Sequence, residues 1–190
     1  MSAEAASAGE RRLLHTREVV CHGYRRADGL YDIEGRLRDL SVEGTWMIFH
    51  GLEAGEAIHD MRLVLTIDTD LVIHRAEAFM DSTATPYCGP AAEVYGRLAG
   101  LKIGPGFRQA AKARVGGVIG CTHLTELLGP MGTTAMQTMF SELREAKRQR
   151  GGAFPDGPLP RPVVIDTCRA YRADSPATER IWPMERRTAA

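Results

Sequence analysis

The hydrophobic period of this chain changes near Met80, and that change limits the fold more than any other feature of the sequence. Before Met80, apolar and polar residues alternate with the two-residue period of half-buried strands. After Met80, apolar residues recur at the three- and four-residue spacing of helices. Strands followed by helices are typical of α+β proteins. We therefore expect an antiparallel β-meander of about four strands, with about three helices packed on one face.

Two stretches predict the hairpins of this meander. In "REVVCHGYRRADGLYDIEGRLRDL", the pair Asp28-Gly29 is a strong signal for a tight turn between two strands. In "AIHDMRLVLTIDTDLVIHRAEAFM", the turn is "DTD", and one face of the first strand is expected to be buried. The side chains on that face are His59, Met61, Leu63, Leu65 and Ile67.

Helices are predicted after the loop "STATPYCGP". Pro90 and Pro105 each suit the first turn of a helix, where the backbone N–H that proline lacks would be unpaired anyway. A longer amphipathic helix is expected from Thr122, and its apolar residues recur as far as Leu143. The pair Gly129-Pro130 lies inside this helix and is expected to kink it.

Changes in composition predict the domain organisation. Residues 1–12 are expected to form a disordered tail and residues 13–150 a single α+β domain. Residues 151–162, "GGAFPDGPLPRP", have the composition of a linker. Residues 163–190 are then a C-terminal extension, in which "VVIDTCRAYR" is compatible with a short edge strand.

The charge balance argues against several classes of partner. The chain has 24 Lys and Arg against 24 Asp and Glu, a net charge of +0, so no overall field favours nucleic acid or an anionic membrane. No apolar run approaches the roughly 20 residues of a membrane span, and "MSAEAASAGERR" lacks the apolar stretch of an export signal. We expect a cytoplasmic protein with a small-molecule substrate and without nucleic-acid or membrane partners.

Cysteines and histidines at the ends of predicted elements form a candidate metal site. His59 opens a core-facing strand, Cys88 precedes one helix, and Cys121 precedes another with His123 in its first turn. The partial positive charge of a helix N-terminus lowers the pKa of a thiol and keeps an imidazole neutral. Thiolate and neutral imidazole are ligands for zinc and iron. The alternative is structural, because buried cysteines and histidines are often only packing residues.

Over nearly its whole length the chain resembles a bacterial family of unknown function, domain-of-unknown-function family 2889. The similar stretches are "LHTREVVCHGYRRADGLYDIEGRLRD", "GEAIHDMRLVLTID", "IGPGFR" and "GGVIGCTHLTELLGP". This resemblance implies no activity. More distantly, residues 57–143 are similar to the iron–sulfur cluster scaffold fold of the NifU amino-terminal domain. "DMRLVLTID" resembles its core strand, and "YCGPA" and "GCTHL" resemble two of its cysteine loops.

The scaffold resemblance implies Cys88 and Cys121 as ligands. Aligned through the strand, the scaffold's first cysteine falls on Ala57 and its aspartate on His59, so one thiolate of a cluster cradle is missing. That departure favours a mononuclear zinc or iron site of His59, Cys88 and Cys121 over an iron–sulfur cluster. His123 or Asp60 would complete the site. Asp60 is the weaker choice, because strand alternation points it away from His59.

Such a site, if three protein ligands leave one position open, suits a metal-dependent enzyme, with a hydrolase or a lyase as candidates. His123 and Glu126 are then the candidate catalytic residues, with Glu126 orienting His123 or acting as a base. Glu126 also suits simple dipole complementation in the first turn. Three alternatives remain open: an iron–sulfur cluster or metal carrier, a metal-free thiol enzyme using Cys121, and a module without any site.

Overall fold

The computed structural model describes residues 12–149 and 157–188. The chain divides into two compact units, residues 1–144 and residues 145–190. The predicted tail falls almost entirely outside the described residues, as does the first half of the predicted linker.

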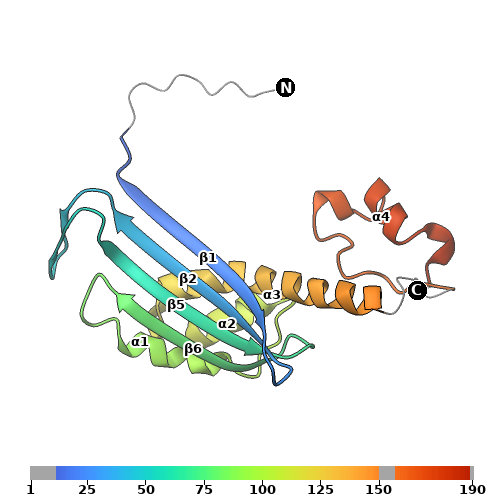
Figure 1. Cartoon of the computed structure of the whole chain (residues 1–190), viewed down its shortest axis with the longest axis horizontal. Helices are drawn as coiled ribbons and strands as arrows, with labels where there is room; N and C mark the ends of the chain where they lie inside the picture. Colours follow the sequence, from blue (N-terminus) through green and yellow to red (C-terminus); the bar gives the residue numbers. More distant parts are fainter. Residues whose placement is uncertain (1–11, 150–156, 189–190) are drawn as a thin grey trace. The chain divides into compact units, whose positions relative to one another are not determined.

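The first unit is built on a four-stranded antiparallel sheet (Figure 1), as the alternating pattern predicts. Its strands are β1 (His15–Arg25), β2 (Tyr31–Ser41), β5 (Ala57–Ile67) and β6 (Ile73–Ser82), in the order β1-β2-β5-β6. The predicted turn at Asp28-Gly29 joins β1 to β2, and the predicted turn "DTD" joins β5 to β6. A short separate hairpin of β3 (Thr45–Trp46) and β4 (Gly51–Leu52) lies in the connection between β2 and β5.

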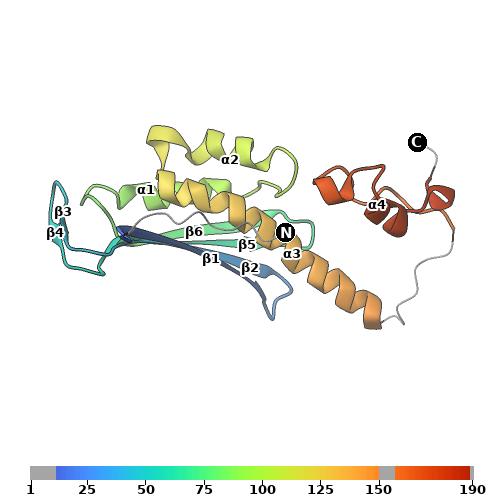
Figure 2. The same cartoon turned by 90° about the horizontal axis from the view of Figure 1, so that it is seen from above.

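The helices of this unit cover one face of the sheet (Figure 2), which confirms the α+β prediction. They are α1 (Pro90–Glu93), α2 (Phe107–Val115) and α3 (Thr122–Gln149), with 3-10 turns η1 (Val94–Leu98) and η2 (Gly117–Ile119). The helix expected from Pro90 ends earlier than the spacing of its apolar residues predicts. Gly96 and Gly100 follow it, and glycine disfavours continued α-helix. Helix α3 continues through Pro130.

The hydrophobic core lies between the sheet and these helices. Strand β2 alternates strictly between core and surface, so Ile33 and Leu37 are fully buried while Arg36 is exposed. From α3, Leu124 and Leu127 are also fully buried against the sheet, and each side chain contributes about 1.5–3 kcal/mol of burial free energy. This burial holds the first turns of α3 over the sheet.

Two glycines allow α3 to approach the sheet closely. A Cβ atom at Gly35 would lie 2.6 Å from the sulfur of Met131, and one at Gly23 would lie 1.9 Å from Oγ1 of Thr138. Real atoms do not approach so closely, so the helix could not keep this position over side chains larger than hydrogen. The glycines therefore set the distance between α3 and strands β1 and β2.

The C-terminal unit contains η3 (Arg169–Tyr171), α4 (Pro176–Ile181) and η4 (Met184–Arg186). Ser175 caps α4 by accepting a hydrogen bond from the amide of Thr178. The indole of Trp182 donates to the carbonyl of Leu159 at 2.9 Å. Residues 163–172 form turns and η3 instead of the compatible edge strand, because their hydrogen bonds close locally. Within the described parts of the chain, no helix is both long and apolar enough to cross a membrane.

We expect Gly23→Ala to destabilise the protein by about 1–3 kcal/mol, because the new methyl group overlaps Thr138. The double variant Gly23→Ala/Thr138→Ala should recover much of that loss. Gly96→Ala is the control, since nothing lies within 4 Å of its Cβ position, and it should be neutral or mildly stabilising. Urea denaturation of all four proteins measures these effects. Equal losses in the single and double variants would contradict the close approach.

Candidate functional site

Three polar side chains line up across the sheet on its helix-covered face. Arg17 of β1 pairs with Asp39 of β2, and Asp39 pairs in turn with His59 of β5. Directly opposed residues in an antiparallel sheet share a face, so the three side chains form one row. The register shifts immediately afterwards, because Leu40 pairs with Ala57 and Ile58 is an extra residue. The row therefore ends at a β-bulge, a feature often found beside functional sites.

Asp39 is the centre of this row and is only 1% exposed. Arg17 donates to both of its carboxylate oxygens, from Nε to Oδ1 and from Nη2 to Oδ2, each at 2.7 Å. The ring of His15 lies 3.1 Å from Oδ1. The Arg17 guanidinium holds the pKa of the Asp39 carboxyl well below its ordinary value, although burial acts in the opposite direction. Asp39 is therefore an ionised carboxylate in the protein interior.

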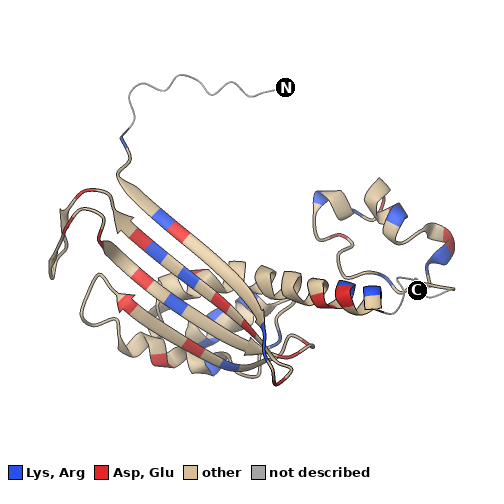
Figure 3. Cartoon of the chain, viewed as in Figure 1, with Lys and Arg blue, Asp and Glu red and all other residues tan. Residues whose placement is uncertain are grey.

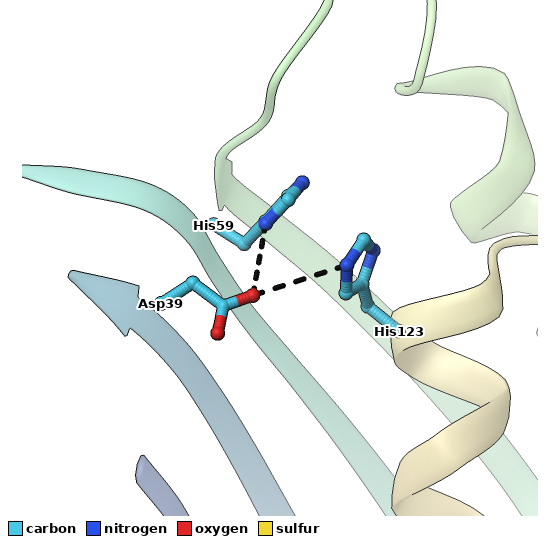
Figure 4. Close-up of side chains that lie close together, drawn as sticks. All are labelled: Asp39, His59 and His123. Atoms are coloured by element: carbon cyan, nitrogen blue, oxygen red, sulfur yellow. Dashed lines mark hydrogen bonds and ion pairs between the residues drawn. The ribbon is translucent and has the colours of Figure 1, made fainter. Parts of the chain in front are cut away.

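Two histidines face the same carboxylate oxygen (Figure 4). Nδ1 of His59 lies 3.0 Å from Oδ2 of Asp39, and Nε2 of His123 lies 3.8 Å from the same atom. The two imidazole rings are 3.8 Å apart between centroids and are tilted by 32°. The residues come from β2, β5 and the first turn of α3, so the sheet and the helix both contribute to the cluster.

His123 is positioned by the loop that leads into α3. The hydroxyl of the fully buried Tyr95 donates to the carbonyl of Cys121 at 2.7 Å and accepts from the Cys121 amide at 3.3 Å. Gly120 is needed here, because a Cβ atom would lie 2.2 Å from the carbonyl oxygen of Val115. The start of α3 is thus held by the core, and His123 lies two residues after the held peptide.

The surroundings of His123 favour its neutral form. Burial lowers the pKa of His123, and the adjacent His59 lowers it further. A neutral imidazole keeps a nitrogen lone pair, which metal binding requires.

Among the residues that the structure describes, Asp39, His59 and His123 form the group whose ligand atoms all lie within 4.8 Å of one another. Two imidazoles and one carboxylate are ligands for zinc and for non-haem ferrous iron. Ligands bound to one such ion at about 2.1 Å are separated by about 3.0–3.4 Å. The His59 and His123 separations from Asp39, 3.0 Å and 3.8 Å, are close to that range.

The structure brings together His59 and His123 from the predicted set. Cys121 lies beside them, with its sulfur 3.9 Å from Nδ1 of His123 and 3.8 Å from the sulfur of Met61. Cys88 is not a member of the group, and its sulfur lies 3.7 Å from the hydroxyl of Thr85. The donor set in the structure therefore contains a carboxylate where the sequence predicted thiolates.

Glu126 and Asp60 have other partners. Glu126 accepts a hydrogen bond from Nη1 of Arg17 at 2.9 Å, so it balances the charge of the cation that holds Asp39. Asp60 lies on the opposite face of the sheet and accepts from Arg36 at 2.6 Å. Figure 3 shows acidic and basic residues distributed along the strands of the sheet. The expected orientation of Asp60 away from His59 is what the structure shows.

Sequence reasoning did not find Asp39 or Arg17. A signal for Asp39 was present, because it continues the inward-facing series of Ile33 and Leu37 by two residues. A carboxylate at a core-facing strand position is rarely buried without a partner. Arg17 carried no comparable signal, since exposed arginines are common on edge strands.

Comparison with family models matches residues 15–137 to one described as "Protein of unknown function (DUF2889)". Neither the curated proteins nor the solved structures contain a match. The similarity to the iron–sulfur scaffold fold therefore stays a prediction.

Replacing Arg17 should lower the stability of the fold. We expect Arg17→Met to lower the free energy of unfolding by about 3–5 kcal/mol at pH 7, because it removes the guanidinium that pairs with both oxygens of the buried Asp39 carboxylate. Arg75→Met is the matched control, since Arg75 pairs with Glu77 where both side chains are exposed, and it should cost under about 1 kcal/mol. Denaturant titrations would contradict this account if the two variants lost equal stability.

The same pair predicts an acid-dependent loss of stability. The pKa of Asp39 is lower in the folded protein than in the unfolded chain, where it is about 3.9. Its contribution is therefore complete above that value and is lost as the pH falls towards the folded pKa. We expect Tm to fall more steeply between pH 5 and pH 3 (about one unit either side of the unfolded pKa) in the natural protein than in Asp39→Asn. Parallel curves measured by circular dichroism would refute the assignment.

Proposed function

The chain belongs to the DUF2889 family, and because that name assigns no activity, we propose a function from the site itself: Asp39, His59 and His123 bind one divalent transition metal, zinc or iron, in a metal-dependent enzyme. The observation that carries the proposal is the convergence of three ligand-type side chains, from two strands and one helix, on a single small volume. This donor set replaces the His59, Cys88 and Cys121 set expected from the sequence.

The electrostatics of the cluster support a divalent cation. The carboxylate charge of Asp39 is balanced by Arg17, and the charge of Arg17 is shared with Glu126. Without a metal, Nδ1 of His59 donates to Asp39. A metal held by Nδ1 would require the neutral His59 ring to carry its proton on Nε2, and Asp39 would then serve as a ligand instead of a hydrogen-bond acceptor.

A site with three protein ligands leaves coordination positions for water and substrate. A zinc or ferrous ion there would activate water or polarise a carbonyl group, and this is the chemistry of metal-dependent hydrolases and lyases. Cys121 lies beside the group without belonging to it, because its sulfur contacts Nδ1 of His123, whereas Nε2 of that ring faces Asp39. The four unpaired cysteines, all within the described residues, are consistent with a reducing compartment such as the cytoplasm.

One specific observation favours a second candidate, metal-free acid–base catalysis. The contact between Nδ1 of His59 and Asp39 engages one ring nitrogen of His59, and in this alternative the other ring nitrogen, Nε2, is the base. A buried carboxylate that orients a histidine in this way is the arrangement used by general bases. In this alternative His59 acts directly on the substrate, and His123 only packs against it.

Metal binding separates these candidates. We expect protein loaded anaerobically with Co²⁺, as a spectroscopic substitute for zinc or iron, to bind one ion per chain. Asp39→Asn, His59→Ala and His123→Ala should each weaken binding by about 10-fold or more, whereas Cys88→Ser should not change it. A sulfur-to-cobalt charge-transfer band that disappears in Cys121→Ser would identify Cys121 as the fourth ligand.

His74→Ala is the matched control, because His74 pairs with Asp68 at 2.7 Å in an exposed histidine–carboxylate pair away from the site. Its metal affinity should equal that of the natural protein. Acid-labile sulfide and two or more irons per chain would instead support the cluster carrier. A folded protein that binds no metal would leave the acid–base candidate.

A further inference from the structure

The loops that extend from the candidate site carry large apolar side chains in solvent. Among them are Trp46 (88% exposed), Ile48 (92%) and Tyr87 (76%), and Phe49 is half exposed. Soluble surfaces rarely gather several large apolar side chains without a binding role. These residues are therefore a candidate recognition surface.

The hairpin of β3 and β4 is rooted in the site itself. It lies within the connection that leaves β2 two residues after Asp39 and enters β5 two residues before His59. Backbone hydrogen bonds between Ser41 and Glu56 and between Gly55 and Ser41 close the base of the connection. Figure 2 shows the hairpin at the end of the sheet, turned towards the face that the helices cover. The hairpin is thus attached to two of the three ligand positions.

A second loop contacts this hairpin through an aromatic pair. The ring of Tyr87, in the loop between β6 and α1, meets the ring of Phe49 edge to face, with centroids 5.6 Å apart. A third loop, η2, leads into the first turn of α3 and presents Val118, which is fully exposed, three residues before Cys121. Each loop that adjoins a strand end or helix start of the site therefore contributes an exposed apolar group.

The charge of the connection indicates which ligands it suits. Residues 42–56 contain Glu43, Glu53 and Glu56 and no lysine or arginine. Anionic membrane lipids attract basic segments, so this composition disfavours a membrane surface. The acidic residues do not disfavour binding of an uncharged apolar group of a small molecule. Apolar side chains beside a few convergent polar groups suit a small molecule that carries both an apolar and a polar part.

We propose that Trp46, Ile48, Phe49 and Tyr87 form the surface that recognises the apolar portion, an aryl or alkyl group, of the substrate that reacts at the Asp39, His59 and His123 site. The substrate is then a small molecule with a polar reactive end and an apolar body. This inference rests on the proposed function for the position of the reactive end, whereas recognition of the apolar body does not depend on a metal.

Two matched chelators test the proposal on the full, Co²⁺-loaded chain. Acetohydroxamate and 4-phenylbutyrohydroxamate have the same metal-binding head, and only the second has an apolar body. We expect the second to bind at least about 10-fold more tightly by calorimetry, since each fully buried methylene adds about fourfold. In Trp46→Ser/Phe49→Ser/Tyr87→Ser this preference should fall below about threefold, while acetohydroxamate binds unchanged.

Leu143→Ser is the control, because Leu143 is an exposed apolar residue of α3 outside the four-residue surface. It should keep the full preference for the longer hydroxamate. The proposal is overturned if the natural protein shows no preference, or if the triple variant keeps it.

A metal-independent arm covers the case in which neither hydroxamate binds and the proposed metal function fails. N-phenyl-1-naphthylamine, a neutral apolar probe, should quench the fluorescence of Trp46, with Trp46→Phe as the blank that leaves Trp182. Because the triple variant lacks Trp46, its binding is compared through the probe's own fluorescence, and equal enhancement by the natural protein and the triple variant would also overturn the proposal. So would a Trp46 spectral shift with phosphatidylcholine vesicles but not with the probe, because the surface would then recognise membranes.

Discussion

The ion pair between Arg17 and Asp39 is the interaction on which the site depends. A carboxylate that is 1% exposed is unfavourable in the interior unless a cation and several hydrogen bonds compensate its lost hydration. Arg17 supplies both in a two-pronged contact and is itself anchored by Glu126 of α3. The pair thereby connects the edge strand, the next strand and the long helix. Without it, the Asp39 carboxylate would be buried beside the two imidazoles with no guanidinium partner.

Close packing elsewhere in the fold places the remaining members of the site. Glycines in β1 and β2 let α3 lie against the sheet, and Tyr95 holds the peptide of Cys121 at the start of that helix. Together these contacts place the ring of His123 with its centroid 3.8 Å from that of His59. The apolar loops extend from the same strand and helix ends, so the candidate site and the proposed recognition surface share one framework.

Much of the fold follows from local pattern. Alternation in residues 57–67 and the turn signal at Asp28-Gly29 predict strands that the structure contains. His59 and His123 were identified because each lies at the end of a strongly patterned element. Cys88 also lies at a helix start but is not a member of the group. A position at a helix start does not predict which other element the side chain faces. Asp39 was missed because charged residues on strands are usually exposed.

The sequence by itself determined the order of the elements, the face of each strand that is buried, and the two histidines at element ends. These properties depend on periodicity and turn chemistry, which act over a few neighbouring residues. Only the tertiary structure decided that Asp39 replaces Cys88 beside those histidines and that Arg17 neutralises it. That choice depends on strand register and on the path of α3 across the sheet. Both are set by contacts between residues more than 20 positions apart, such as Arg17 with Asp39.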